Sequence, residues 1–367
     1  MFAAGLVRLQ ASPVCYNDGC GMLSRRMRCF IRGNSMSHPP VVEVLLATYN
    51  GARFLPEQVN SLLKQDYENI RILARDDGSS DETAELLARY AARFPSRFHV
   101  LPASPGGGSP KDNFLLLMQA STADYVCFCD QDDVWLSDKV SKSKQAMDGL
   151  EREWGPDVPL LVFTDLRLVD SNLHTIHPSF WSYMGIRPER IHRLPRLLVQ
   201  GVVTGCTAML NRALVERAMR MPEDAYMHDR WISWLAAFLG RSAIVSTQTV
   251  LYRQHGGNAV GTGTNIGDSA TSAPRPLWQK IRHPRIAPEL LIRWEISQRQ
   301  ARAFLRAHEA ELRPAQRKLV RGFLSCQTSR SRLVRVASLI RYGFYHVGVK
   351  PNLAMMIHLW KMNEDGC

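Results

Sequence analysis

Three carboxylates, Asp130, Asp132 and Asp133, lie within four positions, directly after the apolar stretch Tyr125–Cys129. Carboxylates this close repel one another, so they are stable together only around a cation or in full contact with water. Their oxygens suit Mg²⁺ or Mn²⁺, either of which could bridge to the oxygens of a diphosphate. Two acidic residues separated by one position are also common in solvated turns, and the spacing alone favours that explanation.

A second acidic turn contains Asp76 and Asp77 in the segment DDGSSD. Ser79 and Glu82 have the spacing of a capping box, so part of this segment is expected to start a helix. Either aspartate could instead accept a hydrogen bond from a pyrimidine N–H or a ribose hydroxyl. The chain contains neither Gly-x-Gly-x-x-Gly nor Gly-Lys-Ser/Thr, which argues against dinucleotide-fingerprint and P-loop nucleotide binding.

Two further residues could take part in chemistry. Asp229 opens an apolar stretch of helical pattern, where it could be a helix N-cap or a general base facing a cleft, and the residues leave both roles open. His255 precedes two glycines, and a lone histidine is more often a surface or core residue than a ligand.

The elements that must position these residues alternate regularly. Near-continuous apolar runs predict buried strands, and helical patterns fill the intervals between them. The predicted strands are 41–47, 70–74, 98–101 and 125–129, and the helices are 55–65, a helix capped by one of residues 79–81 and ending near 94, 113–120, and a helix from a Ser137 cap to about 153. This order predicts a Rossmann-like, mostly parallel sheet flanked by helices.

In such a sheet, ligands bind beyond the carboxyl ends of the strands. The polar clusters TYNG, DDGSSD and DQDD each follow a predicted strand, so all three are expected to face one crevice. That convergence makes a metal and nucleotide site the better interpretation of the carboxylates. Further strands are predicted at 160–163, 206–210, 244–245 and 249–253, a helix at 229–239, and helices at 290–310, 314–324, 333–344 and 353–360.

Charge divides the chain of 367 residues. Residues 271–367 carry 18 Lys and Arg against 6 Asp and Glu, whereas residues 39–270 carry 23 against 27. The acidic middle argues against a nucleic-acid-binding protein, and the basic C-terminal region suits an anionic surface or an ordinary solvated helical subdomain equally well. The predicted organisation is an extension or over-long start at 1–38, a catalytic domain at 39–260, a linker at 261–276 and a basic helical region at 277–367.

The eight cysteines form no C-x-x-C pair, which predicts reduced thiols and no zinc site. No segment reaches the roughly 18–20 apolar residues that a membrane span needs. Residues 1–32 lack the apolar core of a signal peptide.

Six motifs occur in an order that resembles family 2 glycosyltransferases of the GT-A fold, and they span Val41–Val260. They are ATYNG, DDGSSDET, CDQDDVW, GCTAML, HDRW and LYRQHGGN. The combination of DQDDVW, HD-x-W and YRQHGGN is similar to the rhamnosyltransferase-like branch that builds bacterial surface polysaccharides. One departure is Arg75, which stands where this family usually has an apolar residue, and which is expected to contact phosphate or to be exposed.

The resemblance implies roles for the residues at the matching positions. Thr48, Tyr49 and Asn50 would line the nucleotide pocket, and Asp76 or Asp77 would contact the base. Asp130 would contact the ribose, Asp132 would bind Mg²⁺ or Mn²⁺, and His255 would lie near the metal or the diphosphate. Asp229 would be the catalytic base.

The implied activity is an inverting, metal-dependent transfer of a sugar from a nucleotide-diphosphate donor, with dTDP-L-rhamnose favoured over UDP-hexoses. The implied acceptor is a glycan or a polyprenyl-diphosphate-linked glycan, used at the cytoplasmic face of the plasma membrane with peripheral contact to anionic lipid. A sugar-phosphate nucleotidyltransferase would carry a Gly-rich basic loop where TYNGARF stands. A non-catalytic sugar-nucleotide-binding scaffold is the remaining alternative, and Asp130, Asp132 and Asp229 argue against it.

Overall fold

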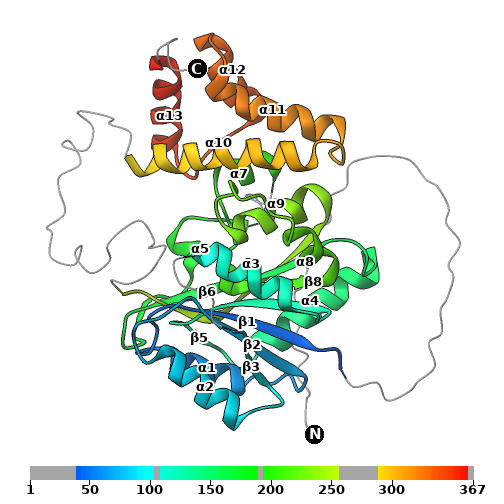
Figure 1. Cartoon of the computed structure of the whole chain (residues 1–367). Helices are drawn as coiled ribbons and strands as arrows, with labels where there is room; N and C mark the ends of the chain where they lie inside the picture. The colour runs from blue at the N-terminus through cyan, green and yellow to red at the C-terminus, as the bar shows by residue number, and fades with distance from the viewer. Residues whose placement is uncertain (1–38, 103–107, 189–192, 256–287, 363–367) are drawn as a thin grey trace, which may run out of the picture.

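The computed structural model describes residues 39–102, 108–188, 193–255 and 288–362 (Figure 1). The predicted N-terminal extension at 1–38 and the predicted linker at 261–276 lie outside these residues. In chain order the elements are β1 (Val42–Thr48), α1 (Leu55–Leu63), β2 (Ile70–Asp76), α2 (Thr83–Arg93), β3 (Phe98–Val100), α3 (Pro110–Ala120), β4 (Tyr125–Asp130), β5 (Val134–Trp135), α4 (Lys139–Trp154), β6 (Leu160–Val169), β7 (Thr175–His177), α5 (Phe180–Tyr183), α7 (Leu194–Val199), the 3₁₀ turn η1 (Gly205–Thr207), β8 (Ala208–Asn211), α8 (Arg212–Ala218), α9 (His228–Leu239), β9 (Arg241–Arg253), α10 (Pro288–His308), α11 (Pro314–Thr328), α12 (Arg332–Tyr342) and α13 (Val349–Lys361).

One sheet organises the fold, in the order β3-β2-β1-β4-β8-β6-β9-β5, with β7 paired to β6. Strands β3, β2, β1 and β4 are parallel neighbours, and β8 runs antiparallel between β4 and β6. The apolar runs that predicted buried strands therefore form the parallel half, which is flanked on both faces by helices, and the predicted α/β class is confirmed.

Helices cover both faces of the sheet. Figure 1 shows α1 and α2 on one face and α3 and α9 on the other. Strand residues alternate between the two resulting cores: Val44 and Leu46 join one, whereas Leu45 joins the other. This alternation follows from the two-residue side-chain period of a strand.

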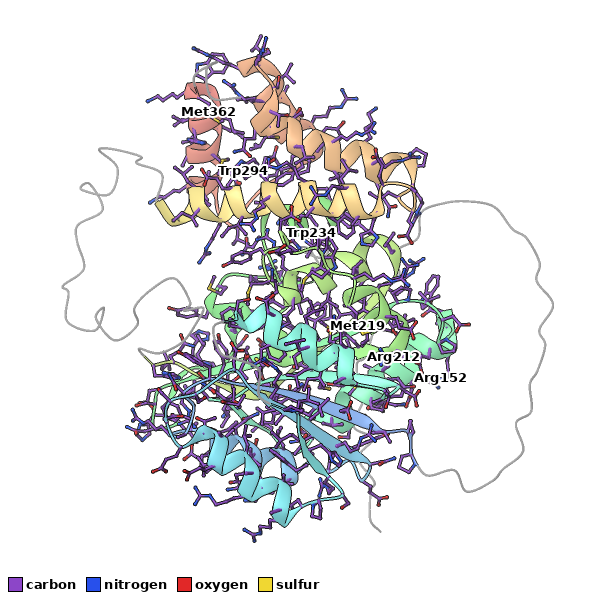
Figure 2. All side chains as sticks on the ribbon, in the orientation of Figure 1. Arg152, Arg212, Met219, Trp234, Trp294 and Met362 are labelled. Atoms are coloured by element: carbon purple, nitrogen blue, oxygen red, sulfur yellow. The ribbon has the colours of Figure 1, made fainter. Side chains whose placement is uncertain are left out.

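The C-terminal helices pack directly on α9. Figure 2 shows Trp234 of α9 beneath α10, and Trp294 on α10. The ring of Trp234 lies 5.6 Å from that of Phe304, and the ring of Trp294 lies 5.0 Å from that of Phe323 on α11. The buried side chains of α10–α13 thereby continue one of the two sheet cores. The division into a catalytic domain and a C-terminal region remains a prediction, although the two parts share a hydrophobic core.

Several local predictions were wrong. Residues 241–253 form one strand, β9, where two short strands were expected, because both of its halves pair with β6, the first before and the second after a register shift between Thr164 and Asp165. The N-cap of α4 is Asp138, not Ser137. Asp229 is not an N-cap, since α9 is capped at Met227.

Candidate active site

Thr48, at the end of β1, is joined to the end of β2 by a side-chain hydrogen bond. Its hydroxyl donates to Asp76 Oδ1 at 2.9 Å, and the other oxygen of Asp76 accepts from the backbone N–H of Ser79 at 2.8 Å. The Ser79 hydroxyl also donates to Asp76 Oδ1. Ser79 is therefore bonded to Asp76 rather than to a helix end, and the predicted capping box is wrong: it is Asp81 that accepts from the first N–H of α2, on Thr83.

The turn after β1 is held against the turn after β4. Tyr49 donates its N–H to Gln131 Oε1 at 2.7 Å, and Gln131 Nε2 donates to the Tyr49 carbonyl at 2.8 Å. Asn50 adopts a left-handed backbone (φ 49°), and its side chain accepts from the Ser80 N–H at 2.8 Å. A Cβ on Gly51 would lie 2.2 Å from Gln131 Oε1, so a larger residue would displace the Gln131 side chain that joins the two turns. The Tyr49 ring is left exposed at the edge of the site.

Arg75 is buried, so the expectation that it contacts phosphate or is exposed was wrong. Its guanidinium donates to Asp77 Oδ1 and to Asn113 Oδ1, each at 3.0 Å. All three side chains are at least nine-tenths buried. A charge can be buried here because it is paired and hydrogen-bonded. Arg75 therefore fixes Asp77 against α3, beside Gly108.

Asp130, at the end of β4, lies among other carboxylates. Burial, and then the negative charges of Asp132 and Asp229, raise the pKa of Asp130 to about 7. Both Asp130 and Asp229 are half-buried, so part of each residue remains exposed. A group of crowded carboxylates is electrostatically suited to a divalent ion or to a proton.

Asp229 occupies the first turn of α9. Burial raises the pKa of its carboxyl to about 6, and backbone N–H groups of Arg230 and Gly205 that donate to it limit the rise. A partly exposed carboxylate whose pKa lies near neutrality is suited to accept a proton. The geometry favours the general-base hypothesis over the helix-cap hypothesis for Asp229.

His228 fixes the position of Asp229. Its ring packs 4.3 Å from Phe114 and 4.9 Å from Phe128, and burial lowers its pKa to about 3, so it is a neutral part of the core. Gly205 of η1 approaches this ring so closely that a Cβ would lie 2.9 Å from His228 Nε2. The first turn of α9 is thus wedged between η1, α3 and β4.

Asp132 follows β4 and His255 follows β9. The two side chains come together although they are 123 positions apart in the chain. His255 Nε2 lies 2.8 Å from Asp132 Oδ2. Arg253 positions this pair: its side chain donates to the Asp132 carbonyl at 2.7 Å, and its guanidinium packs over the Phe54 ring at 4.4 Å and pairs with Glu57. A carboxylate and an imidazole in contact can hold a divalent cation of the Mg²⁺ or Mn²⁺ type.

Asp133 is separate from that pair. Its side chain is fully buried, accepts from the Arg253 N–H at 3.1 Å, and has a pKa raised well above its usual range by burial and by Asp132 and Asp130. Ligand atoms of Asp130, Asp133 and Cys206 lie within 4.8 Å of one another. Cys206 is buried and its pKa is raised well above normal, so this set offers a protonated thiol, which Mg²⁺ and Mn²⁺ do not favour. The pair Asp132 and His255 fits such an ion better.

The structure brings the predicted residues to one edge of the sheet. Thr48, Tyr49, Asn50, Asp76 and Asp77 come from the β1 and β2 ends, and the remaining ones from the ends of β4 and β9 and the start of α9. The Thr48 side chain is buried and bonded to Asp76, so it holds the ends of β1 and β2 together.

Sequence reasoning missed four residues of the site: Gln131, Gly205, His228 and Arg253. Gln131 lies between the two predicted metal-site aspartates, and the other three lie inside motifs that carry the family resemblance: Gly205 in GCTAML, His228 in HDRW and Arg253 in LYRQHGGN. Their positions were therefore a usable signal.

The chain resembles known glycosyltransferases in sequence and in fold. Residues 43–219 match the family model described as Glycosyl transferase family 2. Over 232 residues the chain is 28% identical to the dTDP-rhamnosyl transferase RfbG of Shigella flexneri, covering 60% of this chain and 75% of that one. It is also 28% identical over 227 residues to an uncharacterized glycosyltransferase, alr2836, of Nostoc sp., covering 59% and 66%. The crystal structure of S. aureus TarS 1-349 in complex with UDP-GlcNAc superposes with a TM-score of 0.54 at 15% identity, covering 87% and 89%, which shows a shared fold.

Proposed function

We propose that this chain, a glycosyltransferase of GT-A fold, is an inverting, metal-dependent enzyme of surface polysaccharide biosynthesis. The match of residues 43–219 to glycosyl transferase family 2 and the shared fold support the proposal. The proposed donor is dTDP-L-rhamnose, which the name of the Shigella flexneri relative supports. The proposed acceptor is a hydroxyl of a glycan carried on a polyprenyl diphosphate. The observation that carries the proposal is the placement of Asp229, with its pKa of about 6, beside Asp130 at the crevice.

In the proposed reaction Asp229 removes the proton of the acceptor hydroxyl. The acceptor oxygen attacks the anomeric carbon of the donor as the bond from that carbon to the nucleotide diphosphate breaks. A single displacement inverts the configuration at this carbon, and the proton remains on Asp229. The Gly205 and Arg230 N–H groups orient the carboxylate for this step.

Asp132 and His255 would hold a divalent cation, and their 2.8 Å contact is consistent with that role. A bound Mg²⁺ or Mn²⁺ would neutralise negative charge on the departing diphosphate. Asp130 would contact the ribose. Tyr49, with its exposed ring, would stack on the base, and Asp77, held by Arg75, is the better placed of the two aspartates for a base N–H, because both oxygens of Asp76 bond to Thr48 and Ser79.

A donor panel tests the enzyme class and the sugar together. Purified protein is incubated with dTDP-L-rhamnose, UDP-glucose, UDP-galactose or GDP-mannose and Mg²⁺ or Mn²⁺, with and without EDTA, and released nucleotide is measured. Release of nucleotide from dTDP-L-rhamnose that EDTA abolishes supports the proposal. Release from a UDP-hexose alone would show that the UDP-hexose, and not dTDP-L-rhamnose, is the donor. Protein that neither binds nor hydrolyses any donor would support the scaffold hypothesis instead.

The base assignment is tested with Asp229→Asn, which keeps the shape of the side chain and removes its ability to accept a proton. General-base catalysis contributes about 10²–10⁴-fold, so transfer should fall by that factor while nucleotide-sugar binding is retained. Asp224→Asn is the matched control, because Asp224 lies five residues earlier and pairs with Arg306 on the surface. Transfer by Asp229→Asn at the wild-type rate would refute the assignment.

We also propose that α12 and α13 contact an anionic membrane. No helix of the described residues is long and apolar enough to cross a bilayer. Residues 312–363 contain ten Lys and Arg and no Asp or Glu. Large apolar side chains nevertheless remain exposed on these two helices: Leu333, Val334, Ile340, Val349, Leu353 and Trp360. Apolar side chains among cations are typical of helices that lie in a membrane interface.

Flotation with vesicles tests this surface. Leu353→Asp should reduce recovery with vesicles rich in anionic lipid, because Leu353 is 54% exposed on α13. Leu116→Asp on α3, which is 40% exposed, is the matched control and should float like the wild type. Equal flotation of the two variants would refute an anionic membrane contact at α13. Equal recovery of the wild-type protein with neutral and with anionic vesicles would also refute it.

A further inference from the structure

A cavity of about 330 Å³ lies where α13 and the turn before it meet α5 and α7. Its walls include Arg187 and Arg196 from the catalytic part and His346, Val349 and Asn352 from the C-terminal part. A hydrogen bond from the Val347 N–H to Gln200 Oε1, at 3.2 Å, joins the two walls. The volume lies within the range of about 300–1,000 Å³ typical of small-ligand sites.

The cavity is strongly cationic. Arg187 and Arg196 make no ion pair with any carboxylate of the described residues. The charges of Arg230 and Arg293 also act on His346, and together with burial they lower its pKa to about 4. Two guanidinium groups therefore line the cavity, and the charges of two further arginines, which are not among its lining residues, also act on the neutral His346 imidazole. Such a concentration of positive charge favours an anion with several oxygens, because guanidinium forks bind phosphate oxygens in pairs.

A second observation concerns a buried polar atom at the cavity wall. His346 is about nine-tenths buried, and its Nε2 has no hydrogen-bond partner among the residues that the structure describes. The backbone around the ring is fixed, because Asn352 Oδ1 accepts from the His346 N–H at 2.7 Å and Asn352 Nδ2 donates to the His346 carbonyl at 3.0 Å. Such an atom calls for an explanation, and a polar ligand or water bound in the cavity would supply one.

The location connects the cavity with the apolar surface. Val349 at the cavity wall is 82% exposed, and Leu353 follows one turn later on α13. From there α13 runs away from the catalytic core (Figure 1). A diphosphate held by the arginines would thus have an apolar path for a lipid along α13. On the catalytic side, the charge that acts on His346 is that of Arg230, the residue after Asp229 in the chain.

We propose that this cavity binds the diphosphate group of a lipid-linked acceptor, with Arg187 and Arg196 as its principal ligands. The inference rests on the proposed transfer to a lipid-linked glycan and adds the place where the acceptor is anchored. It assigns to the acceptor a diphosphate site formed by residues other than those proposed for the donor diphosphate.

Direct binding of farnesyl diphosphate to the full chain tests the proposal. The variant Arg187→Gln/Arg196→Gln should raise the Kd, measured by titration calorimetry, about tenfold or more, because charge-assisted hydrogen bonds to phosphate are lost. The matched control is Arg89→Gln/Arg93→Gln, which removes the same charge from exposed positions on α2. The control should bind like the wild type, and both proteins should release nucleotide from the donor at the wild-type rate.

Two further ligands show whether the cavity recognises a lipid diphosphate or free pyrophosphate. Inorganic pyrophosphate should bind more weakly than farnesyl diphosphate, and farnesol more weakly still. Pyrophosphate binding as tight as that of farnesyl diphosphate would overturn the lipid-linked acceptor, and wild-type Kd values for the double variant would overturn the cavity. Failure of the proposed function is distinct, since it would appear as wild-type protein that releases no nucleotide from any donor.

Discussion

Gly205→Ala is the substitution that most directly tests how the catalytic base is positioned. The added Cβ would lie 2.9 Å from His228 Nε2, whereas ordinary contacts begin near 3.4 Å, so the ring must retreat by about 0.5 Å. Phe114 and Phe128 stand behind the ring at 4.3 and 4.9 Å and leave it little room. The displacement must therefore reach the first turn of α9, and with it Asp229.

Two consequences can be estimated from this geometry. Overpacking of a tight core costs about 1–3 kcal/mol, so the free energy of unfolding should fall by that amount. A misplacement of about 1 Å can cost on the order of 100-fold in rate, so half that displacement should lower transfer by about tenfold.

The pH dependence separates a displaced base from a merely weakened fold. The backbone N–H of Gly205 donates to Asp229 and lowers the pKa of this carboxyl. Weakening that bond should therefore raise the pKa of Asp229, and the acidic limb of the rate profile should move to higher pH. A general loss of stability would lower the rate without moving this limb.

The assay is transfer or donor hydrolysis between pH 5 and 8, together with thermal unfolding. Gly201→Ala is the matched control, because it lies four residues earlier and a Cβ there meets nothing within 4 Å. We expect the control to remain within about 0.5 kcal/mol of the wild-type stability, with an unchanged pH profile. A Gly205→Ala protein with the rate and pH profile of Gly201→Ala would refute the reasoning.

Three further predictions concern the site and its scaffold. The rate should fall as pH drops through about 6, because protonated Asp229 cannot accept a proton, and the acidic limb should disappear from the residual activity of Asp229→Asn. Arg75→Gln should lower the free energy of unfolding by about 3–5 kcal/mol in chemical denaturation, since Asp77 and Asn113 lose a buried cation; a loss below 1 kcal/mol would show that the pair is dispensable. Gly149→Ala in α4 should raise stability by about 0.5–1 kcal/mol, because a Cβ there meets no atom within 4 Å and alanine favours the helix, and a lower melting temperature would contradict this.

The sequence predicted the parallel half of the sheet with small errors at the ends of elements. Strand β1 was expected at 41–47 and lies at Val42–Thr48, and β4 was expected at 125–129 and lies at Tyr125–Asp130. Buried parallel strands are continuous apolar runs, so composition alone identifies them. Strand β9 was divided wrongly because its middle residues, Ser246–Gln248, are polar, and only pairing with β6 keeps them in one strand.

Arg75 is a second position that only tertiary contacts explain. From the sequence it was expected to contact phosphate or to be exposed. Its true partners are Asp77, two positions later, and Asn113 on α3, 38 positions later. Whether a cation is exposed or buried depends on partners that tertiary packing brings to it, and a charge that is paired can be placed in the core.

What the sequence by itself determined was the set of side chains at the strand ends, because the end of a buried strand and the polar residues after it are both local features. That His255 lies near the metal site with Asp132 was implied by the family resemblance alone, because no local pattern relates residues 123 positions apart, and the structure brings the two side chains into contact. The sequence could not show that Gly205 and His228 hold Asp229 in place, since that contact depends on packing between η1, α3 and α9. Tertiary structure decided which carboxylates lie at the crevice, which are buried, and therefore which have a pKa near neutrality.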